Sequence, residues 1–470
     1  MKALVTLPIE ILHLETGAIL LFLALVVKTE FGRATEPDYD LAGGGAPLRL
    51  LPFIFLFMVL AFSQVLNGVS PLLGFELAAA ITLSLFHPAN ALCFMVLMMI
   101  LRPWEIGVPN QFLQLIPRFG IGLCAFSWLL HSTRHARLTP QSRRAALYLA
   151  AFSGWLLVTA LRTPSITQTL SGWFEGYFKA LSIFGLTLYL IEDERSVREL
   201  QLTLVISALS LMAAGIYQLL SVGLTAGRLI SSGTLGDPND VGALIVMALP
   251  FALVPAFRRG SSPLAKTMGL FYAGLAVVVI WLTRSRGTML AVVAQYLVIR
   301  LAKNPKKRLR LLITACVLGA GYLGVTQIIP REKDDMEASQ SSRITYWRTA
   351  VNMAVHNPLL GVGFGQYPEQ YMSYAVGKVY ERGSRTAHSS WFLALGESGF
   401  VGFFFYCAFF ISVVRIAWKN REKRPAQLYS VAGYGMAMSF LSHTYSQYFY
   451  TLMALILASD GVKERRKDGD

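Results

Sequence analysis

Three arginines lie in short polar connections between apolar runs of the chain: Arg228, Arg284 and Arg286. Placing an arginine at membrane depth costs roughly 2.5 to 3.5 kcal/mol on insertion scales, so such a residue usually has an anionic partner. A guanidinium binds phosphate through two parallel hydrogen bonds and can neutralise the charge of a phosphate leaving group. We expect Arg228 and Arg286 to act on such a ligand and Arg284 to bind it. The alternative is that one of them extends to phospholipid headgroups.

A histidine and further basic residues precede another apolar run, in the segment ERGSRTAHSSWFLALGESGFVG at residues 381–402. Arg382, Arg385 and His388 come just before the run, and Glu397 lies about two helical turns inside it. Histidine is the side chain best suited to exchange protons near neutral pH. A lone histidine is more often structural, but the neighbouring arginines make His388 a candidate general base. Arg382 and Arg385 are candidates for substrate binding.

Two more residues are candidates for substrate binding. Asn239 lies in the polar segment at residues 227–240, and His443 interrupts the last apolar stretch at residues 427–461. This stretch is too long for one span, so we expect two short helices that meet near residues 443–450. His443 would then lie beside the same cavity, although a capping or interfacial role is the alternative.

The sequence shows no aspartate-rich cluster suited to Mg²⁺ or Mn²⁺. Asp334 and Asp335 lie in a stretch of mixed charge, and Asp237 and Asp240 flank a Pro-Asn turn. We therefore expect a metal-independent reaction without a cofactor, in which arginine stabilises the charge that a metal would otherwise stabilise.

The elements that position these side chains are strongly apolar. Of 470 residues, 54% are hydrophobic and 15% charged, and the mean hydropathy is +0.51. Apolar runs such as residues 50–66, 199–223 and 265–283 approach the roughly 20 residues that span a bilayer as a helix. They do not alternate with period two, which disfavours a transmembrane β-barrel. The sequence predicts an all-α, polytopic transmembrane bundle of 12 to 15 spans.

The net charge of +15 comes from basic residues in short loops, which argues against nucleic-acid binding. Lysine- and arginine-rich loops lie on the cytoplasmic side of a membrane, and these clusters are at residues 134–144, 258–266, 303–310, 415–424 and 463–467. The expected spans between and beside them are at about residues 146–161, 173–191, 199–222, 241–258, 265–283, 287–302, 310–328 and 391–414.

This topology places the segments that carry Arg228, Arg286 and His388 on the outer face. A long loop at residues 329–390 lies on the same face. We expect an amphipathic helix in this loop, lying on the membrane surface. Its apolar residues, at near-helical spacing, are Ile344, Trp347, Val351, Met353, Ala354 and Leu359.

Several motifs resemble the O-antigen ligase and O-antigen polymerase superfamily over residues 227–417. In chain order they are GDPNDVGALIVMALP, SRGTMLAVVAQYLV, SSRITYWRTAV, HNPLLGVGFGQY and AHSSWFLALGESGFVGFF. We therefore divide the chain into N-terminal transmembrane helices at residues 1–226, a ligase-like region at residues 227–461 and a basic cytoplasmic tail at residues 462–470.

The resemblance implies an inverting glycosyltransferase of the bacterial inner membrane that takes a glycan from undecaprenyl pyrophosphate on the periplasmic face. By the same resemblance, Arg228 and Arg286 hold the pyrophosphate and His388 activates or orients the acceptor hydroxyl. Glu397 supports the site by packing or hydrogen bonding, although Ser398 stands where the family usually has leucine. The acceptor stays open among lipid A core oligosaccharide, another lipid-linked glycan and a protein serine or threonine.

Two other classes of function remain as alternatives. A transporter or flippase of an anionic lipid-linked glycan would also need a cationic pocket within the membrane. However, the sequence shows no paired halves with broken helices, and its polar segments gather at one face instead of the midplane. A scaffolding subunit would have no evident use for Arg286 or for the long outer loop.

Overall fold

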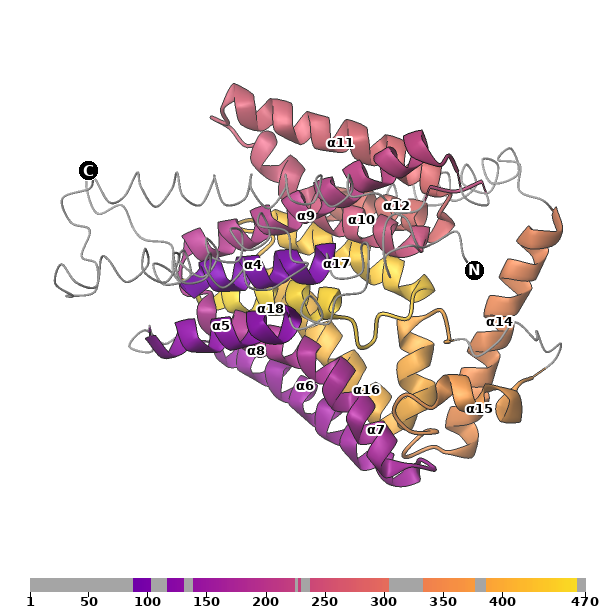
Figure 1. Cartoon of the computed structure of the whole chain (residues 1–470). Coiled ribbons are helices and arrows are strands. Elements are labelled where there is room, and N and C mark those ends of the chain that lie inside the picture. The colour runs from indigo at the N-terminus through magenta and orange to yellow at the C-terminus, as the bar shows by residue number, and fades with distance from the viewer. Residues whose placement is uncertain are drawn as a thin grey trace, which may run out of the picture.

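The structure is a computed structural model that describes residues 88–102, 116–130, 138–224, 227–229, 237–303, 333–376 and 386–462. The regular structure of these residues is entirely helical, which confirms the predicted all-α class (Figure 1). Five helices among the described residues are long and apolar enough to span a membrane. The predicted total of 12 to 15 spans includes segments outside the described residues and stays a prediction.

The helices agree closely with the spans expected from the sequence, except that the expected span at residues 310–328 lies outside the described residues. In chain order they are α4 (Pro88–Leu101), α5 (Ile116–Leu130), α6 (Pro140–Thr159), α7 (Ile166–Gly172), α8 (Phe178–Leu190), α9 (Glu194–Ser221), α10 (Pro238–Ala256), α11 (Pro263–Thr283), α12 (Arg286–Lys303), α14 (Lys333–His356), α15 (Tyr367–Tyr374), α16 (Ser390–Lys419), α17 (Pro425–Ala437) and α18 (Gln447–Gly461).

The last helix, α18, lies at the centre of the bundle and is buried along its length (Figure 1). The Tyr450 ring of α18 packs against Phe184 of α8 at 6.3 Å and against Phe409 of α16 at 6.4 Å between ring centroids. Helices from both sides of residue 226 therefore share one core. The division of the chain at that residue remains a sequence-based proposal.

Small residues let α10, α12 and α17 approach one another closely, as is common between membrane helices. Gly242 of α10 faces Thr288 of α12, and Gly433 of α17 faces Gln295 of α12, with no room for a Cβ at either glycine. The Gln295 side chain donates a hydrogen bond to the Val246 carbonyl oxygen at 2.7 Å. These contacts fix the starts of α10 and α12 relative to each other.

The two ends of the bundle carry different groups. At one end, Asp460 at the end of α18 accepts hydrogen bonds from Thr139 before α6 and from Asn420 after α16. The Arg424 guanidinium pairs with Glu194 at the same end. The basic cluster at residues 415–424 thus lies opposite the starts of α10, α12 and α16, as the charge pattern predicts. Which end faces the outside of the cell stays a prediction.

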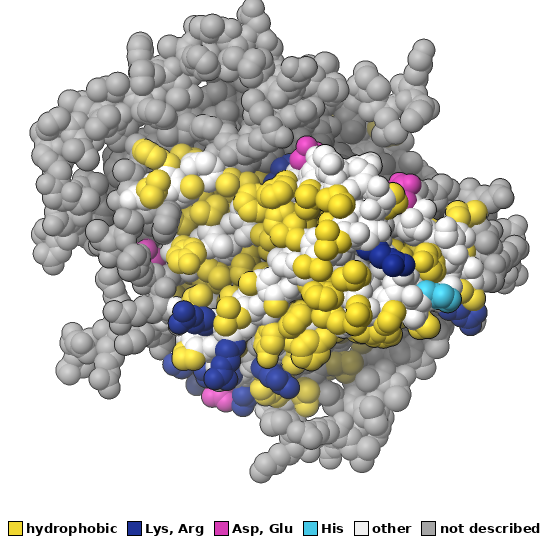
Figure 2. All heavy atoms as spheres, turned by 90° about the horizontal axis from the view of Figure 1, so that it is seen from below, with side chains coloured by type: hydrophobic (Ala, Val, Ile, Leu, Met, Phe, Trp, Pro, Cys, Tyr) yellow, Lys and Arg dark blue, Asp and Glu magenta, His cyan; other side chains and the backbone are white. Residues whose placement is uncertain are grey.

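The exposed surface of the candidate spans is rich in large apolar side chains. On α11, for example, Phe271, Val277 and Trp281 are 57%, 70% and 55% exposed. Figure 2 shows one face of the molecule on which apolar side chains form a broad area, with Lys and Arg gathered toward its edge. Exposed apolar area of this extent is expected where a helix meets lipid.

Helix α14 is present in the predicted outer loop, but its apolar face differs from the prediction. Met353 and Ala354 are fully buried, whereas Ile344 and Val351 are 48% and 40% exposed. The reason is that α14 packs against α16 through the side that carries Met353, Ala350 and Tyr346. The prediction that these apolar residues share one membrane-facing side of the helix is therefore wrong, because Met353 and Ala354 are buried against protein.

The glycine-rich motif after α14 docks onto a kink in α16. Gly399 has a non-helical backbone inside α16, with φ of +65°, and this interrupts the hydrogen bonding of the helix. The carbonyl oxygens of Gly396 and Glu397 instead accept hydrogen bonds from the backbone N–H groups of Val362 and Gly363, at 2.9 and 3.1 Å. The motif GVGFG is thus a structural junction with the motif GESG.

Substitution of Gly399 by alanine tests this junction. Its Cβ would lie 2.5 Å from the Leu359 carbonyl oxygen, in a backbone region that non-glycine residues avoid. We expect Gly399→Ala to lower the free energy of unfolding by about 1 to 3 kcal/mol, measured by thermal unfolding of the purified protein in detergent. Gly274→Ala in α11 is the matched control, because nothing lies within 4 Å of its would-be Cβ. Equal stability of the two variants would contradict the claim that Gly399 is needed at this junction.

Candidate active site

The first turn of α10 is built by the sequence Asp237-Pro238-Asn239-Asp240. Asp237 caps the helix, and its Oδ1 atom accepts hydrogen bonds from the Asn239 backbone N–H at 2.8 Å and from the Asn239 side-chain amide at 2.7 Å. Proline suits the next position because its fixed φ is helical and its missing N–H would be unpaired there. This start places Asn239 and Asp240 on the first turn, facing different neighbours.

Asn239 orients Arg228. The Arg228 Nη2 atom donates to Asn239 Oδ1 at 3.1 Å, and its Nε atom donates to the Thr283 carbonyl oxygen at 2.8 Å. The backbone N–H of Leu229 donates to the Leu282 carbonyl oxygen at 2.9 Å, which holds residues 227–229 against the end of α11. These hydrogen bonds orient the guanidinium group. Arg228 is only half-buried, so part of the residue stays exposed to solvent.

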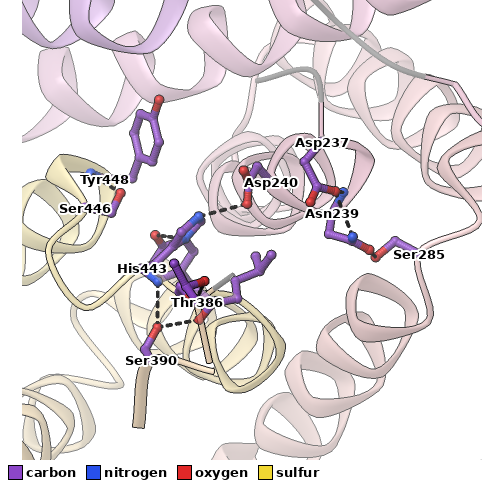
Figure 3. Close-up of polar contacts among 12 residues, drawn as sticks. Asp237, Asn239, Asp240, Ser285, Thr386, Ser390, His443, Ser446 and Tyr448 are labelled. Carbon is purple, nitrogen blue, oxygen red and sulfur yellow. Dashed lines mark hydrogen bonds and ion pairs between the residues drawn. The ribbon is translucent and has the colours of Figure 1, made fainter. Parts of the chain in front are cut away.

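Asn239 also contacts the start of α12, through Ser285 (Figure 3). The Ser285 hydroxyl donates to Asn239 Oδ1 at 2.7 Å and accepts from the Thr288 backbone N–H at 3.3 Å. Ser285 thereby caps α12 and puts Arg286 at its first position. Arg284 ends α11 in the left-handed region, with φ of +49°.

Arg286 is half-buried and, within the described part of the chain, its side chain makes no hydrogen bond or ion pair. It lies at a helix N-terminus, where unpaired backbone N–H groups and the helix dipole favour an anion. A partly buried guanidinium in that position is available to an anionic ligand.

His443 links the first turn of α10 to the start of α16. Its Nε2 atom is 3.0 Å from Asp240 Oδ1 (Figure 3). Its Nδ1 atom is 2.8 Å from the Tyr434 hydroxyl. Its backbone N–H donates to the Ser390 hydroxyl at 2.8 Å. The side chain is only 9% exposed, so both ring nitrogens are taken by protein groups.

The segment that carries His388 is held against the loop before α18. The hydroxyls of Thr386 and Ser442 are 2.6 Å apart, and the Ser390 hydroxyl donates to the Leu441 carbonyl oxygen at 2.7 Å. Between them, His388 has a left-handed backbone with φ of +47°, a conformation that costs energy for a non-glycine residue. The hydrogen bonds on both sides hold it there, with its half-buried imidazole 5.6 Å from the Tyr346 ring.

An apolar groove opens between α14 and the start of α16. Trp347, next to Tyr346, stacks on Phe392 at 5.2 Å between ring centroids. The groove wall is mainly apolar and includes Ile344, Trp347, Val351, Val355, Val376 and Phe392, with Arg348 at its edge.

Glu397 is 2% exposed and its carboxylate has protein partners. Oε1 accepts from the Tyr367 backbone N–H at 3.1 Å, and Oε2 accepts from the Tyr445 hydroxyl at 2.7 Å. Burial raises the pKa of the Tyr367 hydroxyl, which therefore stays protonated and donates to the Tyr346 carbonyl oxygen at 2.7 Å. Glu397 thus joins α16 to α15 and to the loop before α18. The supporting role that the resemblance implies stays a prediction.

Among the residues predicted from the sequence, the structure links Arg228, Asn239 and His443 through hydrogen bonds. Arg284, Arg286 and His388 lie within two residues of Ser285 or Ser390, which belong to the same hydrogen-bonded group. Arg228, Asn239, Ser285 and the start of α12 form one connected group, and Asp240 and His443 extend it to the segment with His388. Arg382 and Arg385 lie outside the described residues. Sequence reasoning missed Asp240, Ser285, Ser390 and Tyr434, although an acidic residue in the first turn of a capped helix is a usable signal.

Comparison with known families bears on this arrangement of arginines and histidine. Residues 271–407 match the O-antigen ligase family model. The resemblance to the O-antigen ligase and polymerase superfamily is thereby confirmed. The matched residues include Arg284, Arg286, His388 and Glu397, whereas Arg228 and His443 lie outside the match and reach it through hydrogen bonds. No curated protein matches the chain.

Glu397→Ala tests whether this carboxylate supports the O-antigen ligase domain. The substitution leaves the buried Tyr367 N–H and Tyr445 hydroxyl without their acceptor, and each unpaired group costs about 1 to 3 kcal/mol. We expect a clear loss of thermal stability in detergent, and a smaller loss for Tyr445→Phe, which removes one of the two donors. A Glu397→Ala variant as stable as the wild type would contradict the supporting role.

Proposed function

We propose that this protein is a metal-independent inverting glycosyltransferase that moves a glycan from undecaprenyl pyrophosphate to an acceptor hydroxyl. The observation that carries the proposal is the pair of arginines in the connected polar group. Arg228 is oriented by Asn239 and Thr283, while Arg286 has no polar partner within the described residues. The match to the O-antigen ligase family, which includes Arg286 and His388, supports the same reaction class.

The arginines act on the leaving group. As the bond between the anomeric carbon and the pyrophosphate breaks, negative charge grows on the pyrophosphate oxygens. Guanidinium groups that are already oriented stabilise this charge without reorganisation during the reaction. Arg228 is held by its two acceptors for this role, and the N-terminus of α12 adds its dipole to the charge of Arg286.

His388 acts on the acceptor. The acceptor oxygen attacks the anomeric carbon from the face opposite the pyrophosphate, and the imidazole accepts the hydroxyl proton or orients the hydroxyl. A positioned general base of this kind contributes about 10²- to 10⁴-fold to the rate. One carbon–oxygen bond forms and one breaks, so the anomeric configuration inverts and no further reactant is needed.

The lipid tail of the donor fits the apolar groove between α14 and α16. Trp347 and Phe392 line the groove, and Phe392 lies on the first turn of α16, close in sequence to His388. A polyprenyl chain bound there would keep its pyrophosphate at the same end of the bundle as the arginines. With the basic clusters on the cytoplasmic side, this end is the periplasmic face of the bacterial inner membrane.

The acceptor hydroxyl belongs to a glycan, to lipid A core or to a protein, and the proposed reaction is the same for each of them.

Transport of a lipid-linked glycan is the alternative function. Reconstitution in liposomes with a lipid-linked glycan distinguishes the two, because a transferase makes a product that carries the donor glycan, whereas a flippase moves the intact donor.

Arg286→Ala and His388→Ala test the reaction. We expect either substitution to reduce transfer by at least about 10²-fold, because one removes leaving-group stabilisation and the other removes the base. Transfer is measured by mass spectrometry of the glycosylated product in membranes or liposomes. Membrane insertion should be unchanged, since neither side chain belongs to the helix core.

The matched control is Arg258→Ala, which removes an exposed arginine at the opposite end of the bundle. Transfer by this variant should equal that of the wild type. Retained transfer by Arg286→Ala or His388→Ala would refute the role assigned to that residue.

A further inference from the structure

His443 contacts both halves of the candidate active site, and both of its ring nitrogens face protein groups. On one side its ring reaches Asp240, the residue that follows Asn239 on the first turn of α10. On the other side its backbone binds Ser390, two residues after His388. The two residues that it joins thus lie close in sequence to Asn239, which orients Arg228, and to His388.

Both ring nitrogens of His443 face protein groups. A carboxylate oxygen accepts, so the contact to Asp240 suits a proton on Nε2, and the Tyr434 hydroxyl can donate to Nδ1 or accept from it. Both nitrogens are therefore occupied at 3.0 and 2.8 Å, and the imidazole has no lone pair left for a substrate hydroxyl.

We propose that His443 is a positioning residue, which sets the distance between the arginine group at α10 and α12 and the His388 segment at α16. The inference rests on the proposed glycosyl transfer and names the device that aligns its two halves. The left-handed backbone of His388 needs support from neighbouring hydrogen bonds, and the contact from His443 to Ser390 is one of them. The contact to Asp240 ties the same support to the turn that orients Arg228.

A positioning role predicts a particular kinetic effect. A shift of about 1 Å between reacting groups can reduce a rate by about 10²-fold. The donor still binds through the arginines, so the loss belongs to the transition state and not to the ground state. We expect His443→Ala to reduce kcat by about 10- to 100-fold while KM changes by less than about threefold.

Conservative variants separate positioning from general damage. In Asp240→Asn the amide oxygen can still accept from Nε2–H, so this variant should be at least about tenfold more active than Asp240→Ala. The double variant His443→Ala with Asp240→Ala should be no worse than His443→Ala alone, because that substitution already removes the contact to Asp240. His356→Ala, an exposed histidine on α14, is the matched control and should transfer as well as the wild type.

Kinetics and thermal unfolding in detergent are measured for the same set of variants. Wild-type kcat in His443→Ala, or an increase of KM at unchanged kcat, would overturn the positioning role. If His443→Ala does not fold, the activity of Asp240→Asn relative to Asp240→Ala tests the positioning role, and a ratio below about tenfold would overturn it. Absence of transfer by the wild type would instead refute the proposed function. The Asp240–His443 contact can still be tested in that case, because the loss of stability in the double variant should be smaller than the sum of the losses in the two single variants.

Discussion

The first turn of α10 is the constraint on which the rest of the site depends. Asp237 and Pro238 fix where the helix begins, and the next two side chains then point about 100° apart around the helix axis. Asn239 faces Arg228 and Ser285, and Asp240 faces His443. A shift in the helix start by one residue would move all three contacts, so the cap determines how the arginines lie relative to α16.

Packing of the helices keeps that turn in place. Gly242 lies one turn further along α10 against Thr288, so α10 and α12 are in backbone-level contact just behind Asn239 and Ser285. On the opposite side of the site, the docking of GVGFG onto the kink at Gly399 holds α14 and α15 against α16. The polar group therefore lies between two rigid junctions, which suits a site that must stabilise charge without reorganising.

The sequence predicted the features that follow from local pattern. Continuous apolar runs gave the helices within a few residues, and the basic loops predicted which helix ends lie together. The Arg228 and Arg286 segments and His388 were found because polar side chains are unusual next to such runs. The family motifs gave the reaction class, and the match at residues 271–407 supports it.

The features that the sequence did not predict depend on contacts between segments that are distant in the chain. Asp240 and His443 are 203 positions apart, and neither hydrophobic period nor loop charge pairs them. The face of α14 was mispredicted because Met353 packs on protein while Ile344 is exposed, and both are apolar. The docking of the two glycine motifs depends on the kink at Gly399, which no local signal marks.

The most direct test of this site is an experimental structure of the protein in lipid with undecaprenyl pyrophosphate bound. We expect the pyrophosphate within hydrogen-bond distance of the Arg228 and Arg286 guanidinium groups, on the same side of the bundle as the His388 imidazole. A pyrophosphate bound at the opposite end of the helices, near Arg424 and Asp460, would contradict the proposed site. So would packed helices that separate His388 from the two arginines.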